Sequence, residues 1–361
     1  MVVENIENDS GTAVSGQVGL KDLTLPGLEE FFRGLGEPSY RARQVAHWIF
    51  KKGATSFDQM TDLPAGLRDR LAGLAGAGGL KTLKKQSSSR GDTVKYLFGL
   101  ADGQAVETVL MVHSYGRSVC ISTQVGCRMG CALCASTLEG LFRNLTAGEM
   151  YDQVLAAQQD SGRRVSHVVL MGTGEPLDNY DQTRNFLINI NAVYGLNISF
   201  RHITLSTCGV VPRIRQLAGE GFPITLAISL HAPEDQLRDR LVPLNRKYPL
   251  ALLLEACREY SGRTGRRITF EYTLLAGVND SPGQAAKLAG LLKGMACHVN
   301  LISYNPVSER DFKRSSPESV RRFQEILDQG GIEATLRREL GADIDAACGQ
   351  LRRRVMFSQT P

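Results

Sequence analysis

The residues best suited to chemistry are three closely spaced cysteines, Cys127, Cys131 and Cys134, in the segment TQVGCRMGCALCAST. The CxxxCxxC spacing places three thiolates in one loop, where Gly126 and Gly130 allow the backbone to curl around a bound group. A structural zinc site takes four protein ligands. Three cysteines instead suit an iron–sulfur cube in which one iron stays open to a substrate or a second cofactor. We therefore predict a [4Fe-4S] cluster that takes part in catalysis.

A zinc site completed from elsewhere in the chain, for example by Cys120, is the alternative interpretation. The spacing favours the cube, because no histidine or further cysteine follows closely enough to close a tetrahedral site. The chain has 8 cysteines. In a chain without a secretory signal, cysteines are more often metal-binding or catalytic than disulfide-bonded.

The bulk composition limits the fold and its partners. A length of 361 residues fits one large domain and a smaller one, and an apolar content of 42% supports a substantial core. The 42 basic against 37 acidic residues permit a polyanionic partner without requiring one. The N-terminal residues lack the basic and apolar regions of a signal peptide, and no apolar run is long enough to cross a bilayer. We predict a cytoplasmic protein that does not enter a membrane.

Composition and periodicity divide the chain into segments. Residues 1–18 are polar and aperiodic, as in a disordered tail. Residues 19–80 form a small helical accessory domain, residues 81–117 a linker and a β-hairpin, residues 118–345 a barrel, and residues 346–361 a C-terminal segment. Apolar side chains at helical spacing indicate the accessory helices: Leu28, Phe31, Phe32, Val45, Trp48, Ile49, Leu67, Leu71 and Leu74.

The main domain alternates strands with helices. The strand-like runs are 119–123, 167–171, 202–206, 224–230, 268–275, 298–303 and 333–337. One intervening helix begins after Thr146, where Glu149 completes a capping box, and others are expected over 181–191, 250–260, 281–295 and 317–328. Continuous Val, Ile and Leu strands alternating with helices indicate a parallel sheet covered by helices. This α/β pattern predicts a partial or full (β/α) barrel with the helical domain and the hairpin, which turns at Asp102-Gly103, as extensions.

In such barrels, functional residues gather at the carboxyl ends of the strands. The cysteine loop follows the first strand, and residues 171–176, 206–209, 229–231 and 304–306 follow or end later strands. Their small and polar side chains can line one pocket. The segment 171–176 is not a dinucleotide-binding loop, because Pro176 stands where the third glycine and the helix start would be.

Three further residues have a functional interpretation beside an ordinary one. Cys348, in DIDAACGQL, could be a nucleophile or simply a small buried cysteine, and Cys120 has the same ambiguity. Glu107, in the outgoing strand of the hairpin, could be a general base if it faces the barrel mouth, although such a carboxylate is usually solvent-exposed. Arginines that could contact phosphate or simply aid solubility flank Cys348: Arg337, Arg338, Arg352, Arg353 and Arg354.

Together these motifs resemble the radical S-adenosylmethionine (SAM) superfamily, and within it the dual-specificity RNA methyltransferases. The resemblance rests on CISTQVGCRMGCALCAST, MGTGEPLDNY, the SLH triplet, SYNP and DIDAACGQL, and it spans roughly residues 20–355. That family methylates carbon 2 of an adenine in 23S ribosomal RNA and carbon 2 of an adenine beside the tRNA anticodon. The resemblance therefore implies a radical SAM-type partial barrel and an RNA methyltransferase.

The resemblance also implies a role for each matching residue. Cys127, Cys131 and Cys134 would hold the [4Fe-4S] cluster. The residues that would contact SAM are Gly174, Glu175, Ser206, Ser229, Leu230, His231 and Asn305. Cys348 would carry the methyl group, Cys120 would resolve the intermediate, and Glu107 would accept a proton.

The family uses two SAM molecules per turnover, because carbon 2 of adenine is not nucleophilic. The first methylates Cys348, since a thiolate is a competent nucleophile. The second is cleaved to a radical that takes a hydrogen from that methyl group, and the resulting carbon radical adds to the adenine. A base then removes the ring proton, and Cys120 releases the product by forming a disulfide with Cys348.

The resemblance also suggests partners. The adenine would leave its stack to enter the barrel mouth, while the basic N-terminal helices and the arginines hold the RNA backbone. We further expect an electron donor of flavodoxin or ferredoxin type and a monomeric protein. Two alternatives remain open: the sister class that methylates carbon 8 of the ribosomal adenine, and a non-catalytic metal-containing RNA-binding protein.

Overall fold

The computed structural model describes residues 17–307, 309–338, 341 and 344. Within them, a ten-stranded sheet has the order β14-β13-β12-β11-β10-β9-β6-β5-β4-β3. Its strands are β3 (Lys81–Ser87), β4 (Thr93–Gly99), β5 (Ala105–His113), β6 (Gly116–Cys120), β9 (His167–Leu170), β10 (Ile203–Thr207), β11 (Thr225–Ser229), β12 (Ile268–Leu274), β13 (Cys297–Ser303) and β14 (Ala334–Leu336). β6 and β9 to β14 pair in parallel, whereas β3 to β6 pair antiparallel. Because β14 and β3 are opposite edges of the sheet, the parallel strands form an open, partial barrel, which confirms the predicted fold class.

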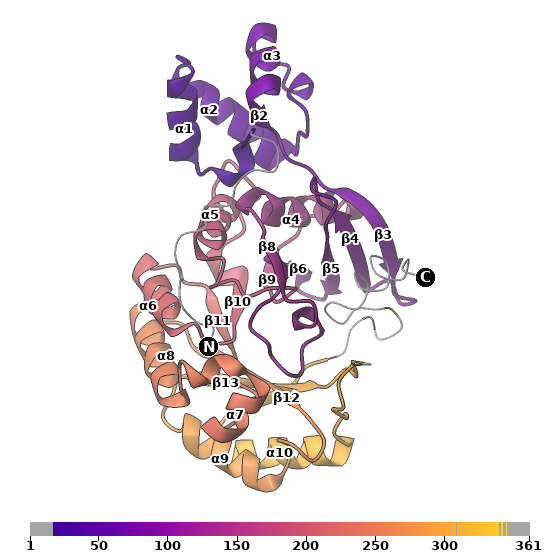
Figure 1. Cartoon of the computed structure of the whole chain (residues 1–361), viewed down its shortest axis with the longest axis vertical. Coiled ribbons are helices and arrows are strands. Elements are labelled where there is room, and N and C mark those ends of the chain that lie inside the picture. The colour runs from indigo at the N-terminus through magenta and orange to yellow at the C-terminus, as the bar shows by residue number, and fades with distance from the viewer. Residues whose placement is uncertain (1–16, 308, 339–340, 342–343, 345–361) are drawn as a thin grey trace.

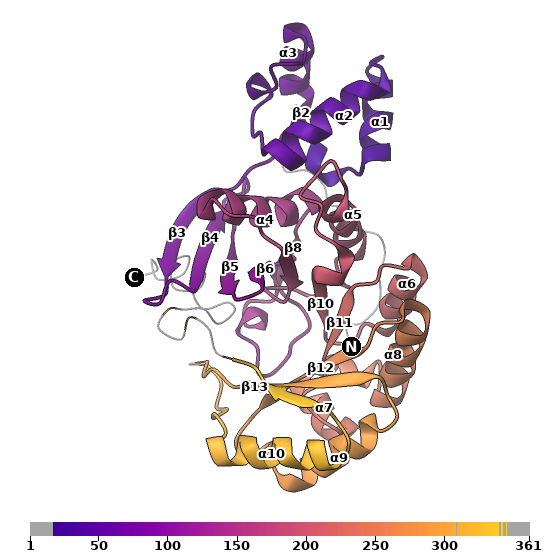
Figure 2. The ribbon, with the colours of Figure 1, turned by 180° about the vertical axis from the view of Figure 1, so that it is seen from behind.

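Helices cover the outer face of the parallel strands (Figure 1, Figure 2). They are α4 (Ala147–Ser161), α5 (Tyr180–Asn191), α6 (Val211–Glu220), α7 (Asp235–Leu241), α8 (Leu250–Thr264), α9 (Pro282–Leu292) and α10 (Pro317–Gln329). Helix α4 begins at the predicted capping box, in which Thr146 Oγ1 accepts from the Glu149 backbone N–H at 3.2 Å. Helices α6 and α7 lie outside the helices predicted from the sequence. Among the described residues, no helix is long and apolar enough to cross a bilayer.

Side chains along each strand point alternately towards the covering helices and towards the inside of the barrel. Tyr272 of β12 packs under α10, where its ring centroid lies 5.2 Å from that of Phe323. Glu271, its neighbour along the strand, therefore points inward. The strand register sets Glu271 beside Ser229 of β11 and Asn300 of β13. Polar side chains from adjacent strands thus line the inner face.

The predicted β-hairpin is present, and a further strand extends it. β4 and β5 pair antiparallel around the expected turn, where Asp102 accepts from the Gln104 backbone N–H at 3.0 Å. The prediction that this region begins with a linker was wrong for residues 81–87, which form β3 against β4. The sequence KTLKKQS of β3 is mostly exposed, and lysines are typical of edge strands that resist pairing with other chains. Such a strand lacks the apolar alternation by which strands are predicted.

The N-terminal segment folds into a helical lobe at one end of the molecule (Figure 1). Its elements are β1 (Val18–Gly19), η1 (Leu20–Asp22), α1 (Leu25–Gly34), α2 (Ser39–Ala46), η2 (His47–Lys52), η3 (Phe57–Gln59), α3 (Ala65–Leu74) and β2 (Ala75–Gly76). The predicted apolar stripes are largely buried, as at Leu28, although Leu74 is 44% exposed. Val18, which the sequence places in a disordered tail, pairs with Ala75. Residues 1–16 of that predicted tail lie outside the described residues.

A buried ion pair fastens this lobe to α4. The Lys21 ammonium contacts Asp152, and the two side chains are only 2% and 6% exposed. Asp152 also accepts from the Gly79 backbone N–H at 2.6 Å, while Asp22 accepts from the Gly148 backbone N–H at 2.9 Å. Burial raises the pKa of Asp152, and the contact with Lys21 opposes that rise. The junction therefore depends on a charge pair that is shielded from water.

We predict that Lys21→Met lowers the free energy of unfolding by about 3–5 kcal/mol, because it leaves the Asp152 carboxylate buried without its cation. The matched control is Lys287→Met, which breaks a pair with Glu234 whose side chains are 56% and 38% exposed. Exposed pairs contribute about 0–1 kcal/mol. Urea unfolding of both variants measures the difference, and equal effects would contradict the prediction.

Candidate active site

The three-cysteine loop lies between two short strands at the carboxyl end of β6. These strands, β7 (Gln124–Gly126) and β8 (Leu141–Asn144), pair antiparallel. Gly126 has a φ of 78°, and a Cβ there would lie 2.0 Å from the Gly140 carbonyl oxygen. The Cys127 backbone N–H donates to the same oxygen at 2.8 Å. Only glycine fits this close approach, so the glycine before the first cysteine sets where the loop starts.

The thiols of the loop lie close enough to affect one another. Burial raises the pKa of Cys127 and of Cys134, and neighbouring thiols of the same loop add to both shifts. The Thr137 hydroxyl donates to the carbonyls of Cys131 and Cys134 at 3.1 and 3.0 Å, which closes the turn. Three thiols on one short loop suit a [4Fe-4S] cube, because each iron of a cube needs only one thiolate from the protein.

The Gly-Thr-Gly-Glu-Pro segment after β9 is locked against the start of the cysteine loop. A Cβ on Gly174, whose φ is 112°, would lie 2.7 Å from the Gln124 backbone nitrogen. The Glu175 backbone N–H donates to Gln124 Oε1 at 2.8 Å. The buried Glu175 carboxylate accepts from the backbone N–H groups of Leu177 and Cys208 at 3.0 and 2.8 Å. Glu175 thus ties this segment to the end of β10.

The predicted SAM-contacting residues of β10 and β11 lie close together at the carboxyl ends of these two strands. The hydroxyl oxygens of Ser206 and Ser229 lie 3.5 Å apart. Leu230 is buried, and its backbone N–H donates to the Glu271 carbonyl at 3.0 Å. Asn305 follows β13 and is exposed. Its neighbour Tyr304 packs in the same apolar cluster as residues of the cysteine loop, so the predicted SYNP turn lies beside that loop.

His231 is held in one protonation state. Its φ of 58° lies in the left-handed region, and its Nδ1 accepts from the Thr273 backbone N–H at 3.1 Å. Asn279 Nδ2 donates to the His231 carbonyl at 2.9 Å. Burial, with a smaller effect from Arg238, lowers the pKa of His231 to about 3. The ring is therefore neutral at physiological pH.

Two residues that the sequence analysis did not single out join these strand ends. Arg238 of α7 is only 1% exposed. Its guanidinium donates to the carbonyls of Cys208, Leu230 and Ser229 at 2.7, 3.1 and 3.2 Å. Cys208 in turn contacts the cluster-loop thiol of Cys131, which lowers the pKa of Cys131. No sequence pattern marks Arg238, whereas Cys208 stands at a strand exit that the barrel rule identifies.

A third missed residue is the inward-facing Glu271. It is 4% exposed and accepts from Asn300 Nδ2 at 2.9 Å. Burial raises the pKa of Glu271. A charged residue within the apolar run ITFEYTLL was the available signal, because it has to face either a partner or the barrel interior.

The candidate base and the candidate resolving cysteine lie on the antiparallel side of the sheet. Glu107 of β5 is 5% exposed, so the ordinary expectation of a solvent-exposed strand carboxylate was wrong. Its Oε2 lies 2.8 Å from the ammonium of Lys95, which is fully buried. Cys120 ends β6 and is also buried, and the register sets it opposite Val109 of β5.

Cys348 and Arg352–Arg354 lie outside the described residues. Arg337 and Arg338 follow β14, and both are exposed to solvent. Hydrogen bonding by Ser88 lowers the pKa of Asp92 in the β3–β4 loop, and the charge of Arg338 contributes to that shift. Arg338, which follows β14 at one edge of the sheet, therefore lies near the β3–β4 loop at the opposite edge.

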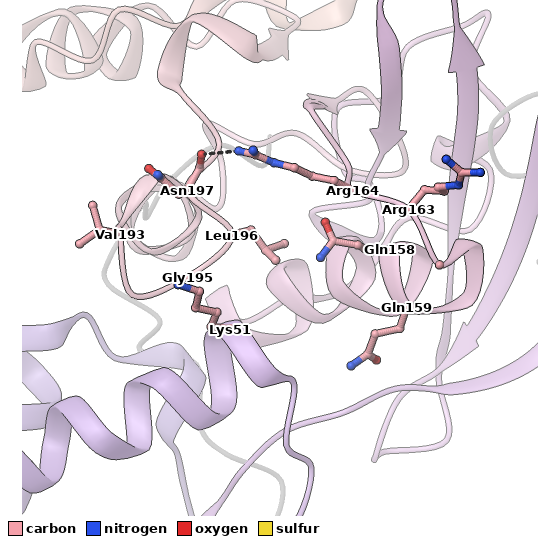
Figure 3. Close-up of a pocket in the computed structure, with 10 residues that line it drawn as sticks. Lys51, Gln158, Gln159, Arg163, Arg164, Val193, Gly195, Leu196 and Asn197 are labelled. Atoms are coloured by element: carbon pink, nitrogen blue, oxygen red, sulfur yellow. Dashed lines mark hydrogen bonds between the residues drawn. The ribbon is translucent and has the colours of Figure 1, made fainter.

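A cavity of about 570 Å³ lies away from these residues, between the N-terminal lobe and the barrel (Figure 3). It is lined by Lys51, Gln158, Gln159, Gly162, Arg163, Arg164, Val193, Gly195, Leu196 and Asn197. Residues 162–164 precede β9 and residues 193–197 precede β10, so the cavity is at the amino ends of these strands. The cysteine loop is at their carboxyl ends, which excludes this cavity as the reaction site.

Comparisons with known proteins agree with this arrangement. Residues 18–76 match the family model described as the ribosomal RNA large subunit methyltransferase N-terminal domain, and residues 121–289 match that of the radical SAM superfamily. The crystal structure of a radical SAM methyltransferase from Sphaerobacter thermophilus covers 92% of the chain, and the match spans 98% of that protein, with a TM-score of 0.88 and 49% identity. Fold and cysteine loop therefore define a radical SAM enzyme, whose cofactors are a [4Fe-4S] cluster and SAM.

Curated relatives show to which family of radical SAM enzymes the chain belongs. A probable dual-specificity RNA methyltransferase RlmN from Desulforamulus reducens is 58% identical, over 94% of this chain and 97% of its own length. One from Pelotomaculum thermopropionicum is 59% identical, over 98% of this chain and 97% of its own length. The chain belongs to the dual-specificity RNA methyltransferase family.

We predict that Cys131→Ala abolishes cluster binding, because one iron of the cube loses its protein ligand. Iron content and visible absorbance of anaerobically reconstituted protein measure this directly. The control is Cys257→Ala, which removes a buried cysteine of α8 and should leave iron binding unchanged. Full iron content in the Cys131 variant would refute the assignment.

Proposed function

We propose that this protein methylates carbon 2 of adenine in 23S ribosomal RNA and in tRNA, next to the anticodon. The observation that carries the proposal is the near-full-length similarity to RNA methyltransferases described as dual-specificity. The three-thiol loop, which lies at the same end of the barrel as the candidate residues that the structure describes, supports it independently. An electron donor of flavodoxin or ferredoxin type and a monomeric state are further parts of this proposal.

The cofactor sites follow from the donor groups. Cys127, Cys131 and Cys134 hold the cluster, which when bound supplies the electron that cleaves SAM to methionine and a 5′-deoxyadenosyl radical. The Glu175 carboxylate is occupied by backbone N–H groups, so this segment meets SAM mainly through the backbone of Gly174 and Glu175.

Further SAM contacts come from the carboxyl ends of the parallel strands. They are Ser206, Ser229, Leu230, His231 and Asn305. Because its Nδ1 accepts from the Thr273 backbone N–H, the neutral His231 ring carries its proton on Nε2, which can donate a hydrogen bond without adding charge beside the sulfonium of SAM.

The remaining steps use the protein's own side chains. Cys348 takes the methyl group, because a thiolate is a competent nucleophile for simple displacement. Glu107 accepts the proton of the ring carbon, and Cys120 forms a disulfide with Cys348 to release the methylated adenine. Both Glu107 and Cys120 are buried, as expected for groups that act where water is excluded.

The N-terminal lobe supplies part of the RNA-binding surface in this proposal. Arg43, Lys51 and Lys52 are exposed on α2 and η2, and the Lys52 ammonium lies 3.5 Å from the centroid of the Trp48 ring. Folded RNA is bound largely through its phosphates and sugars, so a cationic helical surface suits it.

We predict that the triple variant Arg43→Ala, Lys51→Ala and Lys52→Ala weakens RNA binding while SAM binding is retained. Each lost phosphate contact should reduce the slope of log affinity against log salt by about 1. Lys293→Ala is the control, because it changes an exposed lysine after α9, at the far end of the molecule (Figure 1). Unchanged salt dependence in the triple variant would remove the lobe from the RNA interface.

The proposed reaction is tested by mass spectrometry of nucleosides from 23S ribosomal RNA and tRNA treated with reconstituted enzyme. We expect 2-methyladenosine in both RNAs, and none with Cys348→Ala, which should still bind the cluster and SAM. Formation of 8-methyladenosine would assign the protein to the carbon-8 class. Methylation by enzyme stripped of iron would refute radical chemistry altogether.

A further inference from the structure

Lys95 is the most deeply buried cation beside the proposed reaction residues. It lies in β4 with 0% exposure, and its Nζ is 2.8 Å from Glu107 Oε2. The register pairs Leu97 with Glu107 and Lys95 with Val109, so Lys95 and Glu107 form a diagonal pair on one face of the sheet. The steps of the proposed reaction assign no role to this lysine.

The face that Lys95 shares is the inner face of the barrel. Side chains of the opposite face contact α4, where the Tyr96 hydroxyl donates to Asp160 at 2.6 Å and the Thr108 hydroxyl to Gln153 at 2.9 Å. Alternation then turns Lys95 and Glu107 away from α4. Cys120 is opposite Val109, so it shares this inner face. Lys95, Glu107 and Cys120 thus come together from three neighbouring strands.

Burying an ammonium and a carboxylate in a sheet is costly, even when they are paired. Apolar residues such as Leu97 fill the same face at no such cost. A buried ion pair that faces the proposed reaction space therefore suggests a functional reason for keeping the charges. A carboxylate removed from water tends to take up a proton and become neutral, and in that state it could not accept another.

We propose that Lys95 is a positioning residue that keeps Glu107 ionised and oriented as the base that removes the proton from adenine carbon 2. This inference rests on the proposed function. In the step, the C–H bond at adenine carbon 2 breaks, its electron pair stays on the adenine ring, and the proton forms an O–H bond on Glu107. Lys95 neither gains nor loses a proton, so no further reactant is needed.

The surroundings hold the pair in place. The Ser122 hydroxyl donates to the Glu107 carbonyl at 2.8 Å, and the Ser122 backbone N–H donates to Gln153 Oε1 at 2.8 Å. These bonds fasten both β5 and α4 to the segment that leads into the cysteine loop. A base fixed on a strand and supported by such bonds is held more precisely than one on a mobile loop.

The test compares Lys95→Met, which removes the charge, with Lys95→Arg, which keeps it. Reconstituted full-length enzymes are given RNA whose target adenine carries hydrogen or deuterium at carbon 2. For Lys95→Met we expect at least a tenfold slower formation of 2-methyladenosine. We also expect a larger deuterium isotope effect than in the wild type, because proton removal has become slower, and undiminished 5′-deoxyadenosine formation. Lys95→Arg should restore most of the rate and the wild-type isotope effect.

Lys84→Met is the matched control, because Lys84 lies exposed on the adjacent strand β3 and should behave as the wild type. A wild-type rate and isotope effect in Lys95→Met would overturn the inference. So would a parallel loss of SAM cleavage and methylation without a change in isotope effect, which indicates a structural role.

Folding and the underlying reaction are checked separately. The double variant Lys95→Met with Glu107→Gln carries no unpaired charge. If it binds the cluster while Lys95→Met alone does not, the pair is structural and the inference fails. If the wild-type enzyme forms no 2-methyladenosine, the proposed function fails, whereas a normal wild type with an unaffected Lys95→Met removes only the role of Lys95.

Discussion

The site depends on a chain of hydrogen bonds that joins the carboxyl ends of four parallel strands. The Gln124 side chain accepts from the Glu175 backbone N–H, and the Glu175 carboxylate accepts from the Cys208 backbone N–H. The Arg238 guanidinium donates to the carbonyls of Cys208 and Ser229. These bonds are buried, except for the part-buried bond from Arg238 to Ser229, and those of Glu175 and Arg238 involve ionisable groups, for which a hydrogen bond is strong and its loss is costly. A barrel that is open along one side has no closing strand to fix its rim. These bonds supply that rigidity at the end where the cysteine loop and the candidate SAM contacts lie.

The two sides of the sheet contribute different chemistry. The parallel side provides the cysteine loop and small polar groups such as Ser206 and Ser229, with the neutral ring of His231 beside them. The antiparallel side provides the buried Lys95–Glu107 ion pair. In the proposed reaction, SAM cleavage depends on the cysteine loop, whereas proton removal depends on Glu107. The two proposed steps therefore draw on different sides of the sheet.

Much of this could be predicted from the sequence, for physical reasons that particular residues illustrate. Largely buried strands such as ITLAISL (224–230) have a nearly continuous apolar signature, and the Thr146 and Glu149 cap is a local pattern. β3 was missed because its exposed lysines resemble a linker, and α7 because it has only 7 residues. The burial of Lys95 and Arg238 could not be predicted, because it depends on partners supplied by other segments: Glu107 for the first and strand-end carbonyls for the second.

The open edge of the barrel bears on the proposed role of Cys348. β14 and β3 are the two edges of the sheet and do not pair with each other. The charge of Arg338, just after β14, contributes to the lowered pKa of Asp92 in the β3–β4 loop, so the two edges lie near each other there. The antiparallel strands beside that loop carry Glu107 and Lys95 on their inner face. In a closed barrel β14 would pair with β3. Because they do not pair, the proposed reaction can bring Cys348 to Glu107 at the open edge without separating two paired strands.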